Sequence, residues 1–288
     1  MLRIGIVGDV HLLFDQEDVR LLDAQGYALL LFVGDLASYS HRGGLRVART
    51  IGRLRTPALV MPGNHDAANV GQMAAEVLAA DAIIPLVGAG QARRTHELEV
   101  ALSPARAVGF SVHRVASDGL SIDIVAGRPH SAGGQHFAFR PWLRERYGVD
   151  GFEASAEKLR ARVDASDAAA LVFFAHTGPT GLGESRSDIW GCDFRRDEGD
   201  FGDRDLREAL DHARARGKRI LAVVAGHMHH ALKGGGQRRW QLEDDGTLYV
   251  NAACVPRIFE KGKRRVHHHV ELVIDGGRAI AQERLLST

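Results

Sequence analysis

The stretch Ile4-Gly5-Ile6-Val7-Gly8-Asp9-Val10-His11 opens the chain with a short apolar run that leads directly into two potential metal ligands. Four later runs end in the same way: 29–34 before Asp35, 58–63 before Asn64, 171–175 before His176, and 220–226 before His227 and His229. Short continuous apolar runs are typical of strands covered on both faces, and loops at the carboxyl ends of such strands form the ligand crevice of an α/β sheet. We therefore predict that five strand ends converge on one site.

The bulk properties favour one enzyme-sized domain without a polyanionic partner. The chain has 288 residues, and its candidate ligands run from position 9 to position 229, so any division between them would split the site. We predict a single domain over residues 1–288. Lys and Arg total 37 against 36 for Asp and Glu. This balance disfavours nucleic acid as a partner.

Cysteine content and hydropathy indicate a compartment. Cys192 and Cys254 are the only cysteines, too few for a disulfide framework. The amino terminus lacks the long apolar region of a signal peptide, and no run approaches the roughly 18 apolar residues of a membrane span. We expect a soluble, cytoplasmic protein that does not bind a membrane.

The order of elements indicates an α/β fold. Strand and helix patterns alternate over the first 80 residues, which predicts βαβ units and a parallel sheet. The expected strands are 2–8, 28–34 and 57–62, and the expected helices are 15–25, 43–55 and 69–80. Residues 83–127 turn β-like, with pieces at 96–100 and 120–125, so a second, mixed sheet is expected to begin there.

The second half contains two long irregular stretches. Residues 128–150 and 177–203 are predicted loops near the site, and such loops tend to carry function. The rest is regular: helices are expected at 151–165 and 203–216, and strands at 237–242, 247–252, 266–274 and 279–285. The predicted architecture is two sheets with helices outside both.

The ligand types indicate a two-metal centre. Asp, Asn and His together suit Mn, Fe or Zn, and the absence of cysteine ligands argues against a structural zinc site. Asp35 is placed centrally among the candidates and could share its oxygens between two cations about 3.5–4 Å apart. Two such cations would supply a hydroxide nucleophile near neutral pH.

In this order, Asp9-x-His11, Gly34-Asp35, Gly63-Asn64-His65-Asp66, His176 and Gly226-His227-x-His229 resemble the calcineurin-like metallophosphoesterase superfamily. The resemblance covers positions 4 to 229. It implies a four-layer α-β-β-α sandwich of two mixed sheets flanked by helices. It also implies two metal sites, which share one bridging ligand: Asp9, His11, Asp35 and His229 for one, and Asp35, Asn64, His176 and His227 for the other.

The same resemblance makes His65 the group that contacts the phosphate and protonates the leaving oxygen. A histidine titrates near pH 7, as such a proton donor must. Asp66 could orient or charge-stabilise the His65 imidazole, or it could cap the helix expected at 69–80. We therefore expect a hydrolase in which a metal-bridging hydroxide attacks a phosphomonoester or phosphodiester.

The sequence indicates a class of substrate but does not identify the substrate itself. The Gly-Asp-x-x-Asp-Arg-Gly motif of phosphoprotein phosphatases is absent, because Gly34-Asp35 is followed by Leu36-Ala37-Ser38-Tyr39-Ser40. This disfavours protein substrates and leaves phosphorylated small molecules. The stretch 176–183, with the acidic segment after it, resembles a little-characterised bacterial and plastid branch. His41, Arg128 and Trp190 are the candidate substrate contacts.

Specificity is expected to come from the stretches 128–150 and 177–203, the second with an acidic cluster of Asp193, Asp197, Glu198 and Asp200. Two alternatives to the small-molecule hydrolase remain. One is a scaffold or regulatory module on the same fold, and the other is a nuclease, which would need a basic, aromatic-lined track. The sequence leaves the native metals and the oligomeric state open.

Remaining histidines and charges have simpler interpretations. The run His267-His268-His269 lies in a strand-like segment whose alternation points the middle side chain away from its neighbours, and we predict a solvated strand face there. The basic run 261–265 is predicted to be a solvated turn between two strands.

Overall fold

The computed structural model describes residues 1–117, 119–194 and 199–287, and within them the strands form one seven-stranded and one six-stranded sheet. The first sheet has the order β11-β12-β1-β2-β3-β4, with β13 also paired to β12. Its strands are β1 (Leu2–Val7), β2 (Leu29–Phe32), β3 (Ala58–Val60), β4 (Arg106–Ala107), β11 (Ile258–Lys261), β12 (Arg264–Asp275) and β13 (Arg278–Ser287). The second sheet has the order β5-β6-β7-β8-β10-β9. Its strands are β5 (Ser111–Ser117), β6 (Leu120–Ala126), β7 (Ala170–Phe174), β8 (Arg219–Ala225), β9 (Gln241–Asp244) and β10 (Thr247–Asn251).

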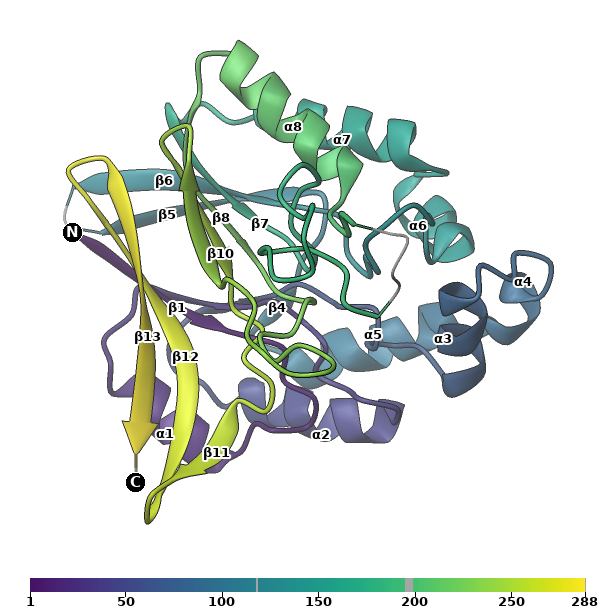
Figure 1. Ribbon diagram of the computed structural model, residues 1–288, viewed down its shortest axis with the longest axis horizontal. Helices are drawn as coiled ribbons and strands as arrows, with labels where there is room; N and C mark the ends of the chain where they lie inside the picture. The colour runs from purple at the N-terminus through teal and green to yellow at the C-terminus, as the bar shows by residue number, and fades with distance from the viewer. Residues whose placement is uncertain (118, 195–198, 288) are drawn as a thin grey trace.

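Helices cover the outer face of each sheet (Figure 1). They are α1 (Gln16–Asp23), α2 (His41–Ile51), α3 (Val70–Val77), α4 (Ile84–Val87), α5 (Gln91–Leu102), α6 (Arg140–Tyr147), α7 (Phe152–Asp164) and α8 (Arg204–Ala215). In Figure 1, α7 and α8 lie above the strands, α2 lies below β1 and β4, and α3 and α4 lie at the right-hand edge.

Strand alternation explains the layers. In β2, Leu29 and Leu31 pack into a core between the two sheets, whereas Leu30 and Phe32 pack against the core under α1, α2 and α5. The side chains of β7 alternate in the same way. Val172 and Phe174 face the core between the sheets, and the other buried residues of the strand face α7 and α8. Three cores therefore separate four layers, and the predicted α-β-β-α sandwich is confirmed. Burial on both faces accounts for the continuous apolar runs.

Both sheets are mixed, and their parallel strands all end at one edge. Strands β1, β2, β3 and β4 pair in parallel, as do β6, β7, β8 and β10. Strand β12 returns antiparallel to β1, with Leu272 opposite Ile4. The loops after β1, β2, β3, β7 and β8 are thereby brought together.

Two predictions about the middle of the chain are wrong. Residues 96–100 form part of α5 rather than a strand, because Arg94, Thr95, Leu98 and Leu102 recur at helical spacing and are all buried on one face. The stretch 128–150 is not a loop throughout, since α6 forms over Arg140–Tyr147 and ends at Gly148, whose φ is 69°.

The histidine run also differs from its prediction. His267, His268 and His269 are all buried, because β12 is paired with β13 along one edge and covered by α1 on one face. Their alternation is as expected: the His267 ring contacts Asp18 of α1, and the His268 ring contacts Glu283 of β13. Residues 261–265 are exposed as predicted, and the turn between β11 and β12 lies at 262 and 263 within them. Among the described residues, no helix combines the length and apolar character needed to cross a bilayer.

Candidate metal centre

All seven candidate ligands lie in the loops at the carboxyl ends of five strands. Asp9 and His11 follow β1, and Asp35 follows β2; the others are Asn64 after β3, His176 after β7, and His227 and His229 after β8. The convergence predicted from the five apolar runs is therefore present in the fold.

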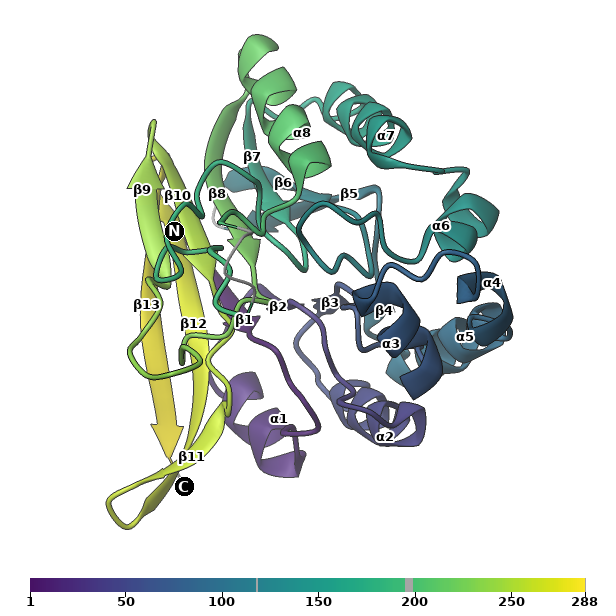
Figure 2. The ribbon, with the colours of Figure 1, turned by 45° about the vertical axis from the view of Figure 1, so that its right-hand side comes forward.

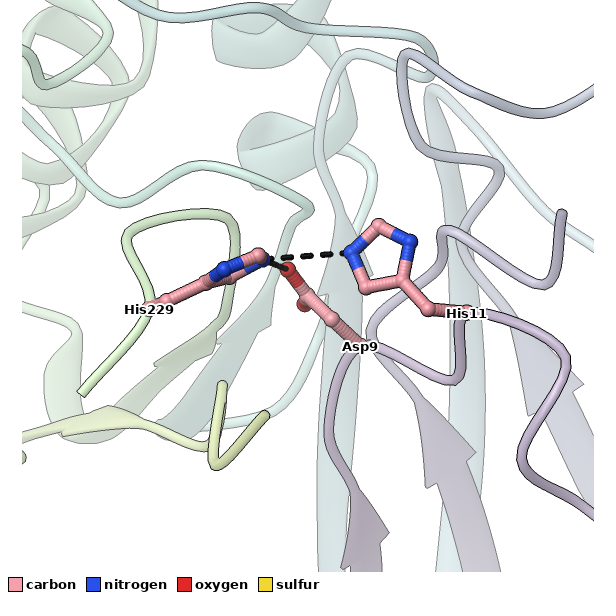
Figure 3. A group of neighbouring side chains, drawn as sticks. All are labelled: Asp9, His11 and His229. Carbon is pink, nitrogen blue, oxygen red and sulfur yellow. Dashed lines mark hydrogen bonds and ion pairs between the residues drawn. The ribbon is translucent and has the colours of Figure 1, made fainter. Parts of the chain in front are cut away.

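One group of side chains consists of Asp9, His11 and His229, whose ligand atoms lie within 4.8 Å of one another. The Nε2 atoms of His11 and His229 are 3.1 Å apart, and His229 Nε2 is 3.5 Å from Asp9 Oδ2. Figure 3 shows the two rings directed at each other, with the Asp9 carboxylate beside His229.

A second group consists of Asp35, His176 and His227, again within 4.8 Å. His227 Nδ1 is 3.2 Å from His176 Nε2, which is also 3.0 Å from Asn64 Oδ1. Four side chains from four strand ends thus present N and O atoms to one point.

Asp35 lies between the groups. Its Oδ2 is 3.8 Å from His11 Nε2, and its Oδ1 is 3.6 Å from His176 Nε2. One carboxylate oxygen is therefore directed to each group, which is the arrangement a bridging ligand requires.

Hydrogen bonds prepare the donors for a cation. His176 Nδ1 donates to the Val33 carbonyl at 2.6 Å, and since a carbonyl only accepts, the Nε2 lone pair faces the site. The Asp9 carboxylate is held by the backbone N–H of His227, at 3.1 Å to each oxygen. This donor set fits divalent metals such as Mn, Fe or Zn.

The backbone at the site is strained. His11, Asp35 and His227 have φ values of 42°, 49° and 70°, in the left-handed region that residues with a Cβ atom seldom adopt. Such strain costs of order 1–3 kcal/mol per residue and clusters at functional sites.

Glycines before the ligands make room for them. A Cβ atom on Gly63 would lie 2.2 Å from Asp35 Oδ1, and one on Gly226 would lie 2.3 Å from Asp9 Oδ1. The glycines of Gly63-Asn64-His65 and Gly226-His227-x-His229 are therefore required by the packing of the carboxylates.

Charge at the site favours metal-binding protonation states. Burial raises the pKa of the Asp9 and Asp35 carboxyls, but the hydrogen bond from His229 to Asp9 and the charge of His176 near both leave each pKa below its usual value. Burial, reinforced by the charge of His176, lowers the pKa of His227 to about 3. Anionic carboxylates and a neutral imidazole are the forms that bind metals.

His65 lies beside this centre without belonging to either group. Its Nδ1 donates to the Ser38 carbonyl, which leaves Nε2, 4.0 Å from Asp35 Oδ2, as the atom that can exchange a proton with a ligand. Burial alone would lower the His65 pKa, but the charge of Asp35 and the hydrogen bond to Ser38 raise it overall. A raised pKa favours the imidazolium form, which can donate a proton.

Asp66 does not cap the helix that follows, but its charge is among the influences that raise the His65 pKa. Its two oxygens accept from the backbone N–H groups of Gly63 at 2.9 Å and Ala37 at 3.1 Å, and the cap of α3 is Asn69. Asp66 therefore ties the loop after β3 to the loop after β2. Burial and the charge of Asp35 raise its pKa to about 7.

The three predicted substrate contacts lie elsewhere. Arg128 is buried, with Nη2 2.7 Å from Asp203 Oδ1 and Nε 2.8 Å from Asp205 Oδ2, so its charge serves an internal ion pair. Trp190 is fully buried in the core beside α8. His41 pairs with Glu97 of α5, its Nε2 2.9 Å from Oε2. Direct substrate contact is therefore wrong for Arg128 and Trp190, and His41 is turned to α5.

A cavity of about 880 Å³ covers the metal centre, and both irregular stretches contribute to its wall. The first contributes Ala132, Gly133, Gln135 and His136, and the second contributes Asp193, Phe194 and Phe201. Asp197 and Glu198 of the predicted acidic cluster lie outside the described residues. Phe201 was not among the predicted site residues, yet its ring stacks on that of His227 with 6.1 Å between the ring centroids. Its only signal in the sequence is that it is an aromatic residue in a Gly- and Asp-rich loop.

A third group, Asp15, Asp18 and His267, also has metal-binding side chains close together. Arg257 Nη2 lies 2.9 Å from Asp18 Oδ1, however, so a guanidinium already supplies the positive charge. Although burial raises the Asp18 pKa, the charge of Arg257 brings it to about 2.

Comparison with known proteins agrees with this geometry. The sequence model of a family described as calcineurin-like phosphoesterase matches residues 2–231. No curated protein matches the chain. Among solved structures, a dimetal phosphatase from Danio rerio is similar at 11% identity and a TM-score of 0.54, with 99% of this chain and 98% of that chain covered. A Haemophilus influenzae NAD nucleotidase is similar at 13% identity and a TM-score of 0.50, with 99% of this chain but 49% of that chain covered. At these identities the structural likeness establishes the fold alone.

Proposed function

Because the chain belongs to the calcineurin-like phosphoesterase family and is a metal-dependent phosphoester hydrolase, we propose that its seven convergent side chains hold two divalent cations. Asp9, His11 and His229 would hold one cation and Asn64, His176 and His227 the other, with Asp35 shared. The observation that carries this proposal is the position of Asp35, whose two oxygens lie 3.8 and 3.6 Å from imidazole nitrogens of the two groups.

Bound there, a pair of Mn, Fe or Zn ions supplies charge that polarises the phosphoryl group and lowers the pKa of water. The protein provides the remaining chemistry. His65, with Nδ1 fixed on the Ser38 carbonyl, holds a proton on Nε2 and transfers it to the leaving oxygen of the ester. Burial of Asp9 and Asp35 keeps their charges close to the cations rather than screened by water.

The cavity supports a phosphorylated small molecule as the substrate. Among its described lining residues, Lys233 is the only lysine or arginine, so there is no basic track for a nucleic acid strand. All seven ligands and His65 are retained, which disfavours a scaffold without activity. The low cysteine count favours a reducing, cytoplasmic location.

The test is hydrolysis of p-nitrophenyl phosphate and bis-p-nitrophenyl phosphate by protein loaded with Mn²⁺, Fe²⁺ or Zn²⁺. We expect turnover that a chelator abolishes and that added metal restores. The relative rates on the two esters will distinguish a phosphomonoesterase from a phosphodiesterase. Metal binding without turnover on either ester would favour the scaffold.

A further inference from the structure

The cavity above the metal centre is much larger than a phosphate group needs. Its floor includes Asp35, His227 and His229, so whatever fills it is continuous with the reacting phosphate. Its volume of about 880 Å³ lies near the upper end of the range that holds a drug-sized ligand. The organic group of the substrate therefore has room to bind beside the phosphate.

Apolar side chains make up much of the wall of this cavity. Those from α3 and from the segments after β7 and β8 are Val70, Met73, Val77, Phe194, Phe201 and Met228. A ligand that gains affinity from such a wall does so by burying hydrocarbon.

Helix α3 has an inverted pattern of burial. Gln72 and Glu76 are 1% and 4% exposed, whereas Val70 and Val77 are 56% and 57% exposed. Leu78, directly after the helix, is 76% exposed. A surface helix ordinarily buries its apolar face and exposes its polar one. Here Val70 and Val77 border the cavity, and Met73 both lines the cavity and packs into the core beside α8.

Hydrogen bonds hold α3 in this orientation. Gln72 Nε2 donates to Gln91 Oε1 at 2.6 Å, and Arg94 Nη2 donates to Gln72 Oε1 at 2.9 Å, which ties the inner face of α3 to α5. Glu76 Oε2 pairs with His136 Nε2 at 3.2 Å. The helix is thus fixed by its polar face, and Val70 and Val77 line the cavity.

The charges of the wall disfavour a polyanionic organic group. Asp193 and Glu76 are acidic, and the ammonium of Lys233 lies over the Phe194 ring at 5.4 Å. Among the described lining residues beyond the metal centre, a nucleoside polyphosphate would therefore meet two carboxylates and one ammonium. A neutral hydrocarbon group meets no such opposition.

We propose that this cavity binds a long hydrocarbon chain and that the substrate is accordingly a phosphoester of a long-chain apolar alcohol. The proposal rests on the proposed function, since it takes the phosphate to lie at the metals. Helix α3 and the rings of Phe194 and Phe201 line the space for the chain, and Leu78 extends the apolar surface beyond the cavity. Figure 2 shows where α3 lies in the fold.

Binding of alkylphosphonates tests this without hydrolysis, because their C–P bond is not a phosphoester. Isothermal titration calorimetry of the Mn²⁺-loaded protein compares ethylphosphonate with octylphosphonate, both below micelle-forming concentrations. A fully buried methylene group is worth about fourfold in affinity. We expect octylphosphonate, with six more methylene groups, to bind at least about tenfold more tightly.

A double variant locates the effect. Val70→Ser with Val77→Ser should reduce the octyl-to-ethyl affinity ratio to below about threefold. Val100→Ser is the matched control, because Val100 is a valine 62% exposed on α5 and does not line the cavity. Its ratio should equal that of the wild type.

The results separate this inference from the proposed function. Equal affinities of the wild type for the two phosphonates would overturn the hydrocarbon site, even if p-nitrophenyl phosphate is hydrolysed by the same sample. A chain-length preference without hydrolysis would support the site and count against the enzyme. A dimer in sedimentation that the double variant dissociates, with equal phosphonate affinities, would assign the exposed face of α3 to a second copy of the chain.

Discussion

Asp35 combines burial, an unfavourable backbone conformation and contacts with both histidine groups of the site. It is buried, its φ is 49°, its Oδ1 accepts the backbone N–H of His65 at 2.9 Å, and each of its oxygens faces a different histidine group. A buried carboxylate in a strained backbone is costly unless a cation compensates it. This combination is the strongest argument for the bridge.

The bridging role predicts the metal stoichiometry. Wild-type protein should bind close to two divalent ions per chain, and Asp35→Ala should lose both, because each group then lacks its shared ligand. Elemental analysis after gel filtration measures this. Asp275→Ala is the control, since that carboxylate is 71% exposed near the amino terminus. One ion per wild-type chain would contradict a bridge.

The role of His65 predicts a separation of binding from chemistry. His65→Ala should retain its metals while turnover falls by about 10²–10⁴-fold, the usual worth of general acid catalysis. Good leaving groups need little protonation, so the loss should be smaller for nitrophenyl esters than for alkyl esters. Steady-state rates on both ester types test this, and an equal loss would refute the proton donor.

At the scale of elements, Arg128 shows how a long connection is fixed. This buried guanidinium joins the segment after β6 to Asp203 and Asp205 at the start of α8, and the Phe137 ring lies 4.7 Å from it. Burial alone would lower the Arg128 pKa, but the charges of the two aspartates raise it. The residue predicted to grip substrate instead positions the loop that lines the cavity.

Removing this charge should destabilise the fold. Arg128→Leu leaves two buried carboxylates without their cation, and breaking such a pair costs about 3–5 kcal/mol. Arg140→Leu is the control, because Arg140 pairs with Asp150 on the surface and such pairs contribute about 1 kcal/mol or less. Urea denaturation monitored by circular dichroism measures both. Similar losses of unfolding free energy in the two variants would mean that the buried ion pair stabilises the fold no more than the surface pair does.

Strand β12 predicts a pH dependence of stability. Burial, with smaller contributions from the charges of Arg257 and His268, lowers the pKa of His269 to about 3. The unfolded chain, with a His pKa near 6.5, then binds the proton more readily than the folded one. The stability contributed by neutral His269 is complete above about pH 6.5 and is lost as the pH falls toward 3.

Between pH 7.5 and 5.5, wild-type protein should therefore lose about 1.4 kcal/mol more unfolding free energy than His269→Gln does. Urea titrations at the two pH values give the difference. Parallel losses in the two proteins would show that His269 is already protonated in the fold or accessible to water.

The whole molecule is best described as one folding unit, and we propose a single domain. Strand β1 pairs with β12 from the far end of the chain, and the core between the sheets takes Ile4 from one sheet and Phe174 from the other. Neither sheet can keep its inner face buried if the other unfolds. Calorimetry, circular dichroism and tryptophan fluorescence should give one coincident thermal transition, and two resolved transitions would separate the sheets.

The class of fold and the position of the candidate ligands can be predicted from the amino-acid sequence. Strands buried on both faces must be apolar throughout, so the runs before Asp9, Asp35, Asn64, His176 and His227 were visible without coordinates. Once a strand has been identified in the sequence, the residue at its carboxyl end has a known place at the edge of the sheet. The family resemblance added the pairing of ligands between two metals, which remains a prediction.

Tertiary structure alone decided the roles of Arg128, Trp190 and the histidines of β12. Each has a side chain whose surroundings come from segments distant in the sequence: Asp203 and Asp205 for Arg128, the core beside α8 for Trp190, and Asp18 for His267. Local patterns report which face of an element a residue occupies, but not what covers that face. For the same reason, the sequence did not predict that α3 buries Gln72, because the partners that cover this side chain lie on α5.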